Sequence, residues 1–112
     1  MTVEEILTKE FTLRLGKVVV KDEKLEITGK VVGIDLRYSM ITIDTGEENA
    51  WISRIIDCKP YLIKPENLSE EKFDKYRWLD SYGNGESFID FCTEKNIDYK
   101  GLINKGLAYE IN

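Results

Sequence analysis

Few residues in this chain of 112 could carry catalysis. There is no histidine, which removes the commonest general base and the commonest transition-metal ligand. Cys58 and Cys92, the only cysteines, are too far apart in sequence for a zinc-binding pair, and we expect both to be buried free thiols. No glycine pattern matches a phosphate-binding loop or a dinucleotide-binding turn. We therefore expect a protein that is not an enzyme and that uses no cofactor and no metal.

Carboxylates are the one plentiful reactive group. Asp35, Asp44, Glu47 and Glu48 fall on neighbouring turns, and their oxygens are of the kind that magnesium prefers. Acidic clusters in turns are usually solvated, and Asp stabilises turns through its own side chain. The pattern favours turn chemistry over a metal site.

Binding residues are better represented than catalytic ones. Arg37 and Tyr38 lie in a loop between two predicted strands, and Trp51 and Arg54 lie on the next strand along the chain. Tyrosine and tryptophan offer large rigid contact area, and arginine offers directional hydrogen bonds. We expect Tyr38 to be exposed, whereas Trp51 fits either the core or the surface. These residues form the first candidate partner-binding site.

A second aromatic pair follows in the C-terminal half. Trp78 lies on a predicted helix and Tyr82 in the glycine-flanked stretch after it. We expect Trp78 to pack its helix onto the rest of the fold and Tyr82 to be exposed. Trp78 and Tyr82 are included among the candidate partner-binding residues.

The segment that must position the first site is residues 11–65. Its β-branched and aromatic residues, interrupted by Gly29, Gly33 and Gly46, are typical of short strands with bends and tight turns. Five strands are expected, beginning with residues 11–20. The pattern predicts a small SH3-like barrel, with an OB-like barrel as the alternative.

Helices are predicted on both sides of the barrel. Thr2 and Glu5 fit a capping box for a short helix over 3–9. Two to three helices are predicted in a C-terminal extension, 66–112, which is expected to pack on the barrel; their ranges are 69–79, 88–95 and 98–105. The expected fold is α+β, and residues 1–112 are expected to form a single domain.

Charge and hydropathy limit the partners. The formal net charge is −5, with acidic and basic residues interspersed, which disfavours non-specific binding to nucleic acid or to anionic membranes. No apolar run is long enough to cross a bilayer, and the acidic start is unlike a secretory signal. We expect a cytoplasmic protein.

Three segments support a family resemblance: IDTGEENAW at 43–51, CKPYL at 58–62 and DYKGLINKGLA at 98–108. With them the chain resembles uncharacterised small proteins of phages and mobile elements of Bacteroidetes. The chain departs from that pattern in a shorter stretch over roughly 72–90, and Asn96 and Ile97 stand where a histidine is usual. The resemblance implies a mobile-element setting and no activity, so no catalytic residue is transferred.

These observations favour a non-enzymatic protein-binding module, expected to be a phage or mobile-element factor that inhibits or modulates a host system such as a CRISPR effector. The expected partner is a host protein or ribonucleoprotein. One alternative is a nucleic-acid-binding barrel that uses Arg37, Lys30, Arg54 and Lys59 with Tyr38 for stacking. A structural or self-assembling phage protein that uses strand edges is the other.

Overall fold

The structure, a computed structural model, describes residues 1–83 and 85–111. The described residues form three α-helices, two short 3-10 helices and six strands. In chain order the elements are α1 (Val3–Leu13), β1 (Val19–Asp22), β2 (Ile27–Asp35), β3 (Met40–Asp44), β4 (Trp51–Arg54), η1 (Ile55–Asp57), β5 (Cys58–Leu62), η2 (Pro65–Asn67), α2 (Glu70–Tyr82), α3 (Gly85–Glu94) and β6 (Tyr109–Glu110).

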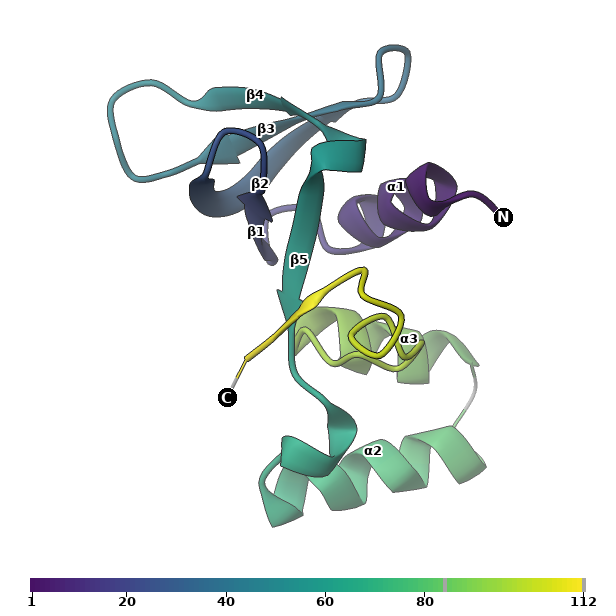
Figure 1. Cartoon of the computed structure of the whole chain (residues 1–112). Coiled ribbons are helices and arrows are strands. Elements are labelled where there is room, and N and C mark those ends of the chain that lie inside the picture. Colours follow the sequence, from purple (N-terminus) through teal and green to yellow (C-terminus); the bar gives the residue numbers. More distant parts are fainter. Residues whose placement is uncertain (84, 112) are drawn as a thin grey trace.

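The six strands form one open sheet in the order β4-β3-β2-β1-β5-β6. Neighbouring strands are antiparallel except β5 and β6, which are parallel. The predicted five-stranded SH3-like or OB-like barrel is therefore wrong, although the α+β content is confirmed. In Figure 1 the β2–β3–β4 part of the sheet lies at the top, α3 and the C-terminal segment below it, and α2 at the bottom.

The sheet stays open because β4 finds no strand to pair with at its outer edge. A closed barrel needs its first and last strands to hydrogen-bond to each other. Here β5 returns to β1, on the far side of the sheet from β4. The turn between β1 and β2 approaches the end of β4 without pairing, and a narrow crevice of about 170 Å³ separates Lys24 and Leu25 from Ile52 and Arg54.

Within the sheet, β2 is bent where the barrel prediction placed its bends. The register between β2 and β3 shifts between Val31 and Gly33, which marks a β-bulge. Gly29 permits the close approach of β3, because a Cβ atom there would overlap the carbonyl oxygen of Asp44. The glycines bend the sheet but do not close it.

The N-terminal helix begins as predicted and ends later. The Thr2 hydroxyl accepts a hydrogen bond from the Glu5 backbone at 3.1 Å, which confirms the cap. The predicted end at residue 9 is wrong, because Leu7 and Phe11 are spaced by one helical turn and both lie in the core. Residues 11–20 therefore do not form the first strand, and β1 begins only at Val19.

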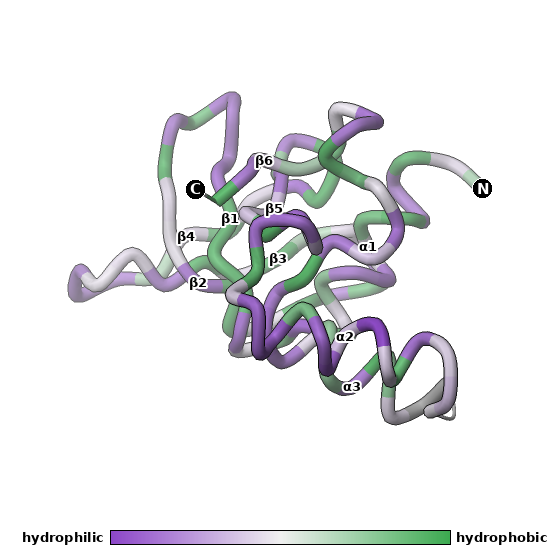
Figure 2. Tube along the Cα trace, turned by 90° about the horizontal axis from the view of Figure 1, so that it is seen from below, coloured by the Kyte–Doolittle hydropathy of each residue, from purple (hydrophilic) through white to green (hydrophobic). Residues whose placement is uncertain are grey.

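The main core lies between α1, one face of the sheet and the segment after α3. Leu7 and Phe11 of α1 pack with buried residues of the strands, including Val31 and Ile43. Leu102 joins the same cluster, so the C-terminal segment does pack onto the sheet. In Figure 2 hydrophobic stretches follow the strands and hydrophilic ones follow the turns.

A smaller cluster joins α2 to α3. Leu79, Phe91, Cys92 and Ile97 are its buried members. Aromatic contacts extend it across the helices, with Tyr76 and Phe88 ring centroids 5.3 Å apart. The predicted helices over 69–79 and 88–95 correspond to α2 and α3. The third is wrong: residues 98–107 form successive turns, in which Asp98 accepts hydrogen bonds from the backbone of Leu102 and Ile103 at 2.8 and 2.9 Å.

Candidate functional site

The strongest candidate surface is the outer face of β2, β3 and β4, which is the face turned away from the core. The pairing register of the strands shows which residues lie on this face, because side chains alternate along each strand and directly opposed residues share a face. Ile41 and Ile43 point into the core, so Thr42 points outward, and Gly33 and Ile52 lie opposite it on the neighbouring strands. The centre of this face therefore carries a glycine, a threonine and an exposed isoleucine.

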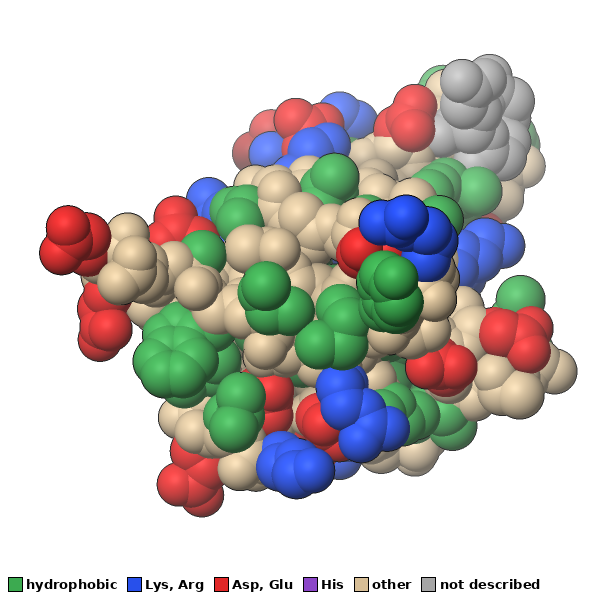
Figure 3. All heavy atoms as spheres, turned by 90° about the horizontal axis from the view of Figure 1, so that it is seen from above, with side chains coloured by type: hydrophobic (Ala, Val, Ile, Leu, Met, Phe, Trp, Pro, Cys, Tyr) green, Lys and Arg blue, Asp and Glu red, His purple; other side chains and the backbone are tan. Residues whose placement is uncertain are grey.

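A groove of about 590 Å³ lies on this face near the turn that joins β2 to β3. Gly33, Thr42 and Ile52 line it together with Met40 and Tyr38. Because Gly33 has no side chain, the surface is hollowed there. Ile52 is 66% exposed and Tyr38 is 70% exposed, so the apolar lining is open to a partner. Figure 3 shows this face, with hydrophobic side chains gathered across it and charged ones around them.

Arg37 and Arg54, two of the predicted site residues, do not line the groove but lie near the β2–β3 turn, at one end of the sheet. Arg37 follows β2 directly, and its guanidinium carbon lies 5.3 Å from the centroid of the Tyr38 ring. Its Nε also lies 3.6 Å from a carboxylate oxygen of Asp35. Arg54 lies opposite Met40 in the β3–β4 register. The structure therefore brings Arg37, Tyr38 and Arg54 to one end of the sheet, and the predicted exposure of Tyr38 is confirmed.

Trp51 does not join the groove. It lies opposite Ile43, on the core side of the sheet, but at the end of an edge strand, where it remains 44% exposed. The sequence left open whether Trp51 is in the core or on the surface, and the structure leaves it exposed, beside the acidic turn at 46–49.

Trp78 and Tyr82 form a separate surface on α2, at the opposite end of the molecule from β4 (Figure 1). Their ring centroids are 6.4 Å apart, and they line a shallow hollow of about 240 Å³ with Asp74, Arg77 and Ser81. Trp78 is 58% exposed, so the prediction that it packs α2 onto the fold is wrong. Tyr82 is 79% exposed, as predicted.

The basic residues of the nucleic-acid alternative are dispersed. Lys30 lies opposite Asp44, at the other end of the outer face from Arg37 and Arg54. Lys59 lies on β5, and its ammonium is 3.1 Å from a carboxylate oxygen of Glu23. A strand of nucleic acid would need a continuous basic path, and these positions do not form one.

A tyrosine cluster on β5 and β6 was missed by sequence reasoning. Tyr61 and Tyr109 stack with centroids 5.1 Å apart. The Tyr109 hydroxyl donates to Glu23 at 2.9 Å, and this bond, followed by Lys59, lowers the pKa of Glu23. The same bond raises the pKa of Tyr109. Lys21 and Lys59 lie over the Tyr109 ring, and Glu23, Lys59 and Tyr109 are paired with one another within the chain.

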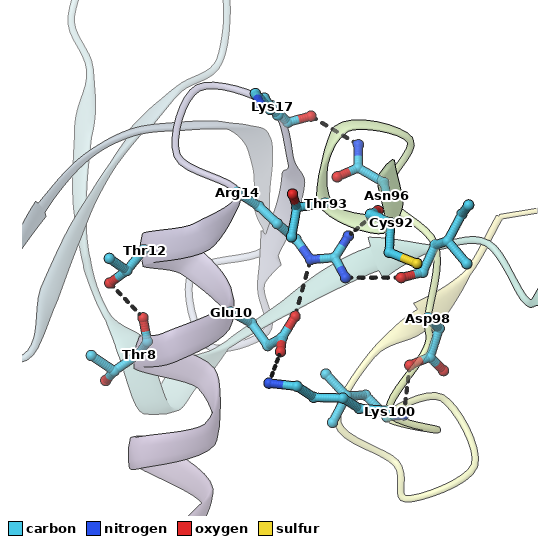
Figure 4. A network of polar contacts seen from close by, with 12 residues as sticks. Thr8, Glu10, Thr12, Arg14, Lys17, Cys92, Thr93, Asn96, Asp98 and Lys100 are labelled. Carbon is cyan, nitrogen blue, oxygen red and sulfur yellow. Dashed lines mark hydrogen bonds and ion pairs between the residues drawn. The ribbon is translucent and has the colours of Figure 1, made fainter. Parts of the chain in front are cut away.

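The most buried charged side chains also have a structural role. Arg14, the C-cap residue of α1, donates to Glu10 at 3.0 Å and to the carbonyl oxygens of Cys92 and Ile97 at 3.2 and 2.9 Å (Figure 4). The second oxygen of Glu10 lies 2.7 Å from the Lys100 ammonium. Every donor of this network bonds to a protein acceptor, so it joins α1 to the C-terminal half rather than presenting a reactive group. Sequence reasoning missed both Glu10 and Arg14.

The remaining reactive groups are held in structural roles. Cys58 and Cys92 are buried free thiols, as predicted, and burial raises the pKa of each to about 12. Asp35 and Asp44 each accept a hydrogen bond from a backbone amide two residues ahead, at 3.0 and 2.9 Å, as turn residues do. Within residues 1–83 and 85–111, no three histidine, cysteine or acidic side chains form a metal-binding group.

Comparison with protein-family models, curated proteins and solved structures gives no match to this chain. The resemblance to phage and mobile-element proteins stays a prediction. In the described part of the chain, no helix has the length and apolar character needed to cross a membrane.

Proposed function

We propose that this chain is a non-enzymatic protein-binding module that docks a partner protein in the groove on the outer face of β2, β3 and β4. The observation that carries the proposal is the groove itself: an apolar hollow with Ile52 and Tyr38 exposed on its lining. Exposed apolar hollows rimmed by polar residues mark interaction sites.

The residues at the rim support a protein partner. Tyrosine and arginine are enriched among the residues that dominate binding energy at protein interfaces. Arg37 is already paired with Asp35, whereas Arg54 has no ion pair with any described residue and remains free to meet a carboxylate of a partner. A partner with an aliphatic or aromatic anchor and a nearby acidic residue fits this arrangement.

The identity of the partner is inferred from the family resemblance. We infer a factor of a phage or mobile element that occupies the surface of a bacterial host protein, a CRISPR effector being one candidate. The resemblance and the acidic balance of the chain, −5, support this setting, because an acidic protein can compete for a groove built for nucleic acid.

The test is affinity capture from a Bacteroidetes lysate with matched variants. Ile52→Asp places a charge in the groove, whereas Leu15→Asp makes the same change at an exposed residue after α1. We expect wild type and Leu15→Asp to retain one protein partner in near-stoichiometric amount and Ile52→Asp to lose it. Equal retention by all three chains, or a partner that disappears on nuclease treatment, would contradict the proposal.

A further inference from the structure

A second cavity lies between α1 and the turns after α3, on a different part of the surface from the groove. It measures about 490 Å³ and is lined by Ile6 and Leu102, by Met1, and by three lysines: Lys9, Lys100 and Lys105. This volume is in the range of pockets that hold small organic ligands. In Figure 1 the C-terminal segment passes below α1, and the cavity lies where the two segments meet.

The cavity is lined by basic residues, although the chain as a whole has a negative net charge. The chain carries an excess of acidic residues, yet no Asp or Glu lines the cavity. Lys9 and Lys105 form no ion pair with any described residue, so their ammonium groups are free to meet an anion. The cavity is therefore a local basic site over an apolar floor.

The third lysine, Lys100, is held in place by an ion pair with a buried carboxylate. Lys100 lies 2.7 Å from Glu10, but Glu10 also accepts from Arg14 at 3.0 Å (Figure 4). One buried carboxylate is thus shared by two cations, so the three groups together carry one net positive charge. Because Glu10 is buried and fixed, the Lys100 ammonium is ordered before any ligand arrives, which lowers the entropy cost of binding.

The turns that form the other wall are also fixed within the chain. Asp98 accepts from the backbone amides of Leu102 and Ile103 at 2.8 and 2.9 Å, and Gly101 and Gly106 adopt positive φ angles of 71° and 76°. Glycine adopts this conformation without strain. The wall therefore has a defined shape set by its own sequence.

We propose that this cavity binds a single-chain anionic amphiphile, with its carboxylate among Lys9, Lys100 and Lys105 and its alkyl chain over Ile6 and Leu102. The apolar residues Ile6 and Leu102 account for an alkyl chain, and the three lysines that line the same cavity account for an anionic head. A neutral alcohol with the same alkyl chain would contact only the apolar residues, and an inorganic anion would contact only the lysines. This site is independent of the groove on the outer face of the sheet.

The test is a titration of the full chain with decanoate, followed by amide chemical shifts in NMR. We expect saturable shifts confined to the first turns of α1 and to residues 100–106. Affinity should fall roughly fourfold for each methylene removed in octanoate and hexanoate, because each buried methylene contributes a constant increment of transfer energy. Decanol and decyltrimethylammonium should bind more weakly than decanoate.

Lysine variants test the assignment of the head group. Lys9→Gln and Lys105→Gln should each weaken decanoate binding about two- to fivefold, the range for an exposed charge pair. Neither should alter the binding of decanol. Lys24→Gln, at an exposed lysine of the β1–β2 turn, is the matched control and should change nothing.

Three results would overturn the proposal. The first is the absence of saturable shifts at residues 100–106. The second is equal affinity for decanoate and decanol. The third is decanoate binding at the groove on the outer sheet face instead, because that groove is not lined by lysine and would bind the alkyl chain alone. The first two results would not bear on protein binding at the outer face.

Discussion

Replacement of Arg14 by methionine is the sharpest test of how the two halves of this chain are joined. Methionine matches much of the arginine side chain in length but donates no hydrogen bond. The change removes the bonds to Glu10, to the Cys92 carbonyl and to the Ile97 carbonyl. It also leaves Glu10, which is fully buried, with Lys100 as its one remaining cation.

The expected cost follows from burial. Removing one partner of a buried ion pair destabilises a protein by about 3–5 kcal/mol when the other charge is left uncompensated. Glu10 keeps Lys100, so we expect a cost near the lower end of that range. The free energy of unfolding of a domain is about 5–15 kcal/mol in total, so Arg14→Met should remove a large fraction of it. Arg37→Met is the matched control: Arg37 is exposed and its pair with Asp35 should contribute about 1 kcal/mol or less.

Urea unfolding, followed by circular dichroism, measures both costs. A second variant, Glu10→Gln with Arg14→Met, removes the buried carboxylate that has lost one of its two cations and should be more stable than Arg14→Met alone by about 0.5–3 kcal/mol. The reasoning would be refuted if Arg14→Met cost no more than Arg37→Met. It would also be refuted if the double variant, compared with the wild type, lost the full sum of the costs of Arg14→Met and Glu10→Gln measured singly.

Three further predictions concern the tyrosine cluster, the thiols and the bend in β2. Tyr109→Phe should raise the pKa of Glu23 in an NMR titration; because that pKa is lowered in the native state, the stabilisation it gives is present above the ordinary carboxyl range and lost as pH falls through the lowered value. An unchanged pKa would contradict the hydrogen bond from Tyr109 to Glu23. Cys58 and Cys92 should react with Ellman's reagent only as the chain opens, since both pKa values are raised to about 12; rapid labelling of the native chain would count against this. Gly29→Ala should lower the free energy of unfolding by about 1–3 kcal/mol, measured by urea, because the new methyl overlaps the Asp44 carbonyl oxygen; a neutral result would refute the close approach.

Local signals in the sequence predicted most of the sheet. Alternation and turn chemistry located β3 and β4. Asp35 and Asp44 accept backbone hydrogen bonds in turns, as the sequence predicts. Which strands become neighbours is not local information. The parallel pairing of β5 with β6 brings Tyr61 beside Tyr109, which is distant in sequence. As a result β6, and not β4, occupies the outer edge of β5, and the sheet does not close into a barrel.

The end of α1 shows how two periodicities compete. Residues 11–15 alternate apolar with polar, as a strand does, but Phe11 also follows Leu7 at helical spacing. The helix wins because it buries Phe11 and brings Arg14 to the carbonyl oxygens of Cys92 and Ile97. Those acceptors are distant in sequence, so no local pattern could have shown that Arg14 is a core residue.

The candidate site was only partly predictable, because some of its residues come together through contacts that are distant in sequence. Arg37 and Tyr38 lie in a turn, where exposure follows from local structure, and Tyr38 is exposed. The groove also needs Gly33, Thr42 and Ile52, which come together only through the register of three strands. Sequence reasoning grouped Trp51 with Arg54 because they are close along the chain, but alternation places them on opposite faces.

Site-specific photocrosslinking inside a bacterial host tests the proposed interaction surface most directly. A benzophenone amino acid replaces Tyr38 at the groove in one chain and Tyr82 on α2 in another, since both tyrosines are highly exposed. We predict one discrete protein adduct from position 38 and none from position 82. An adduct from position 82 alone, an adduct to nucleic acid, or no adduct at position 38 would contradict the assignment of the outer face of β2, β3 and β4 as the protein-binding surface.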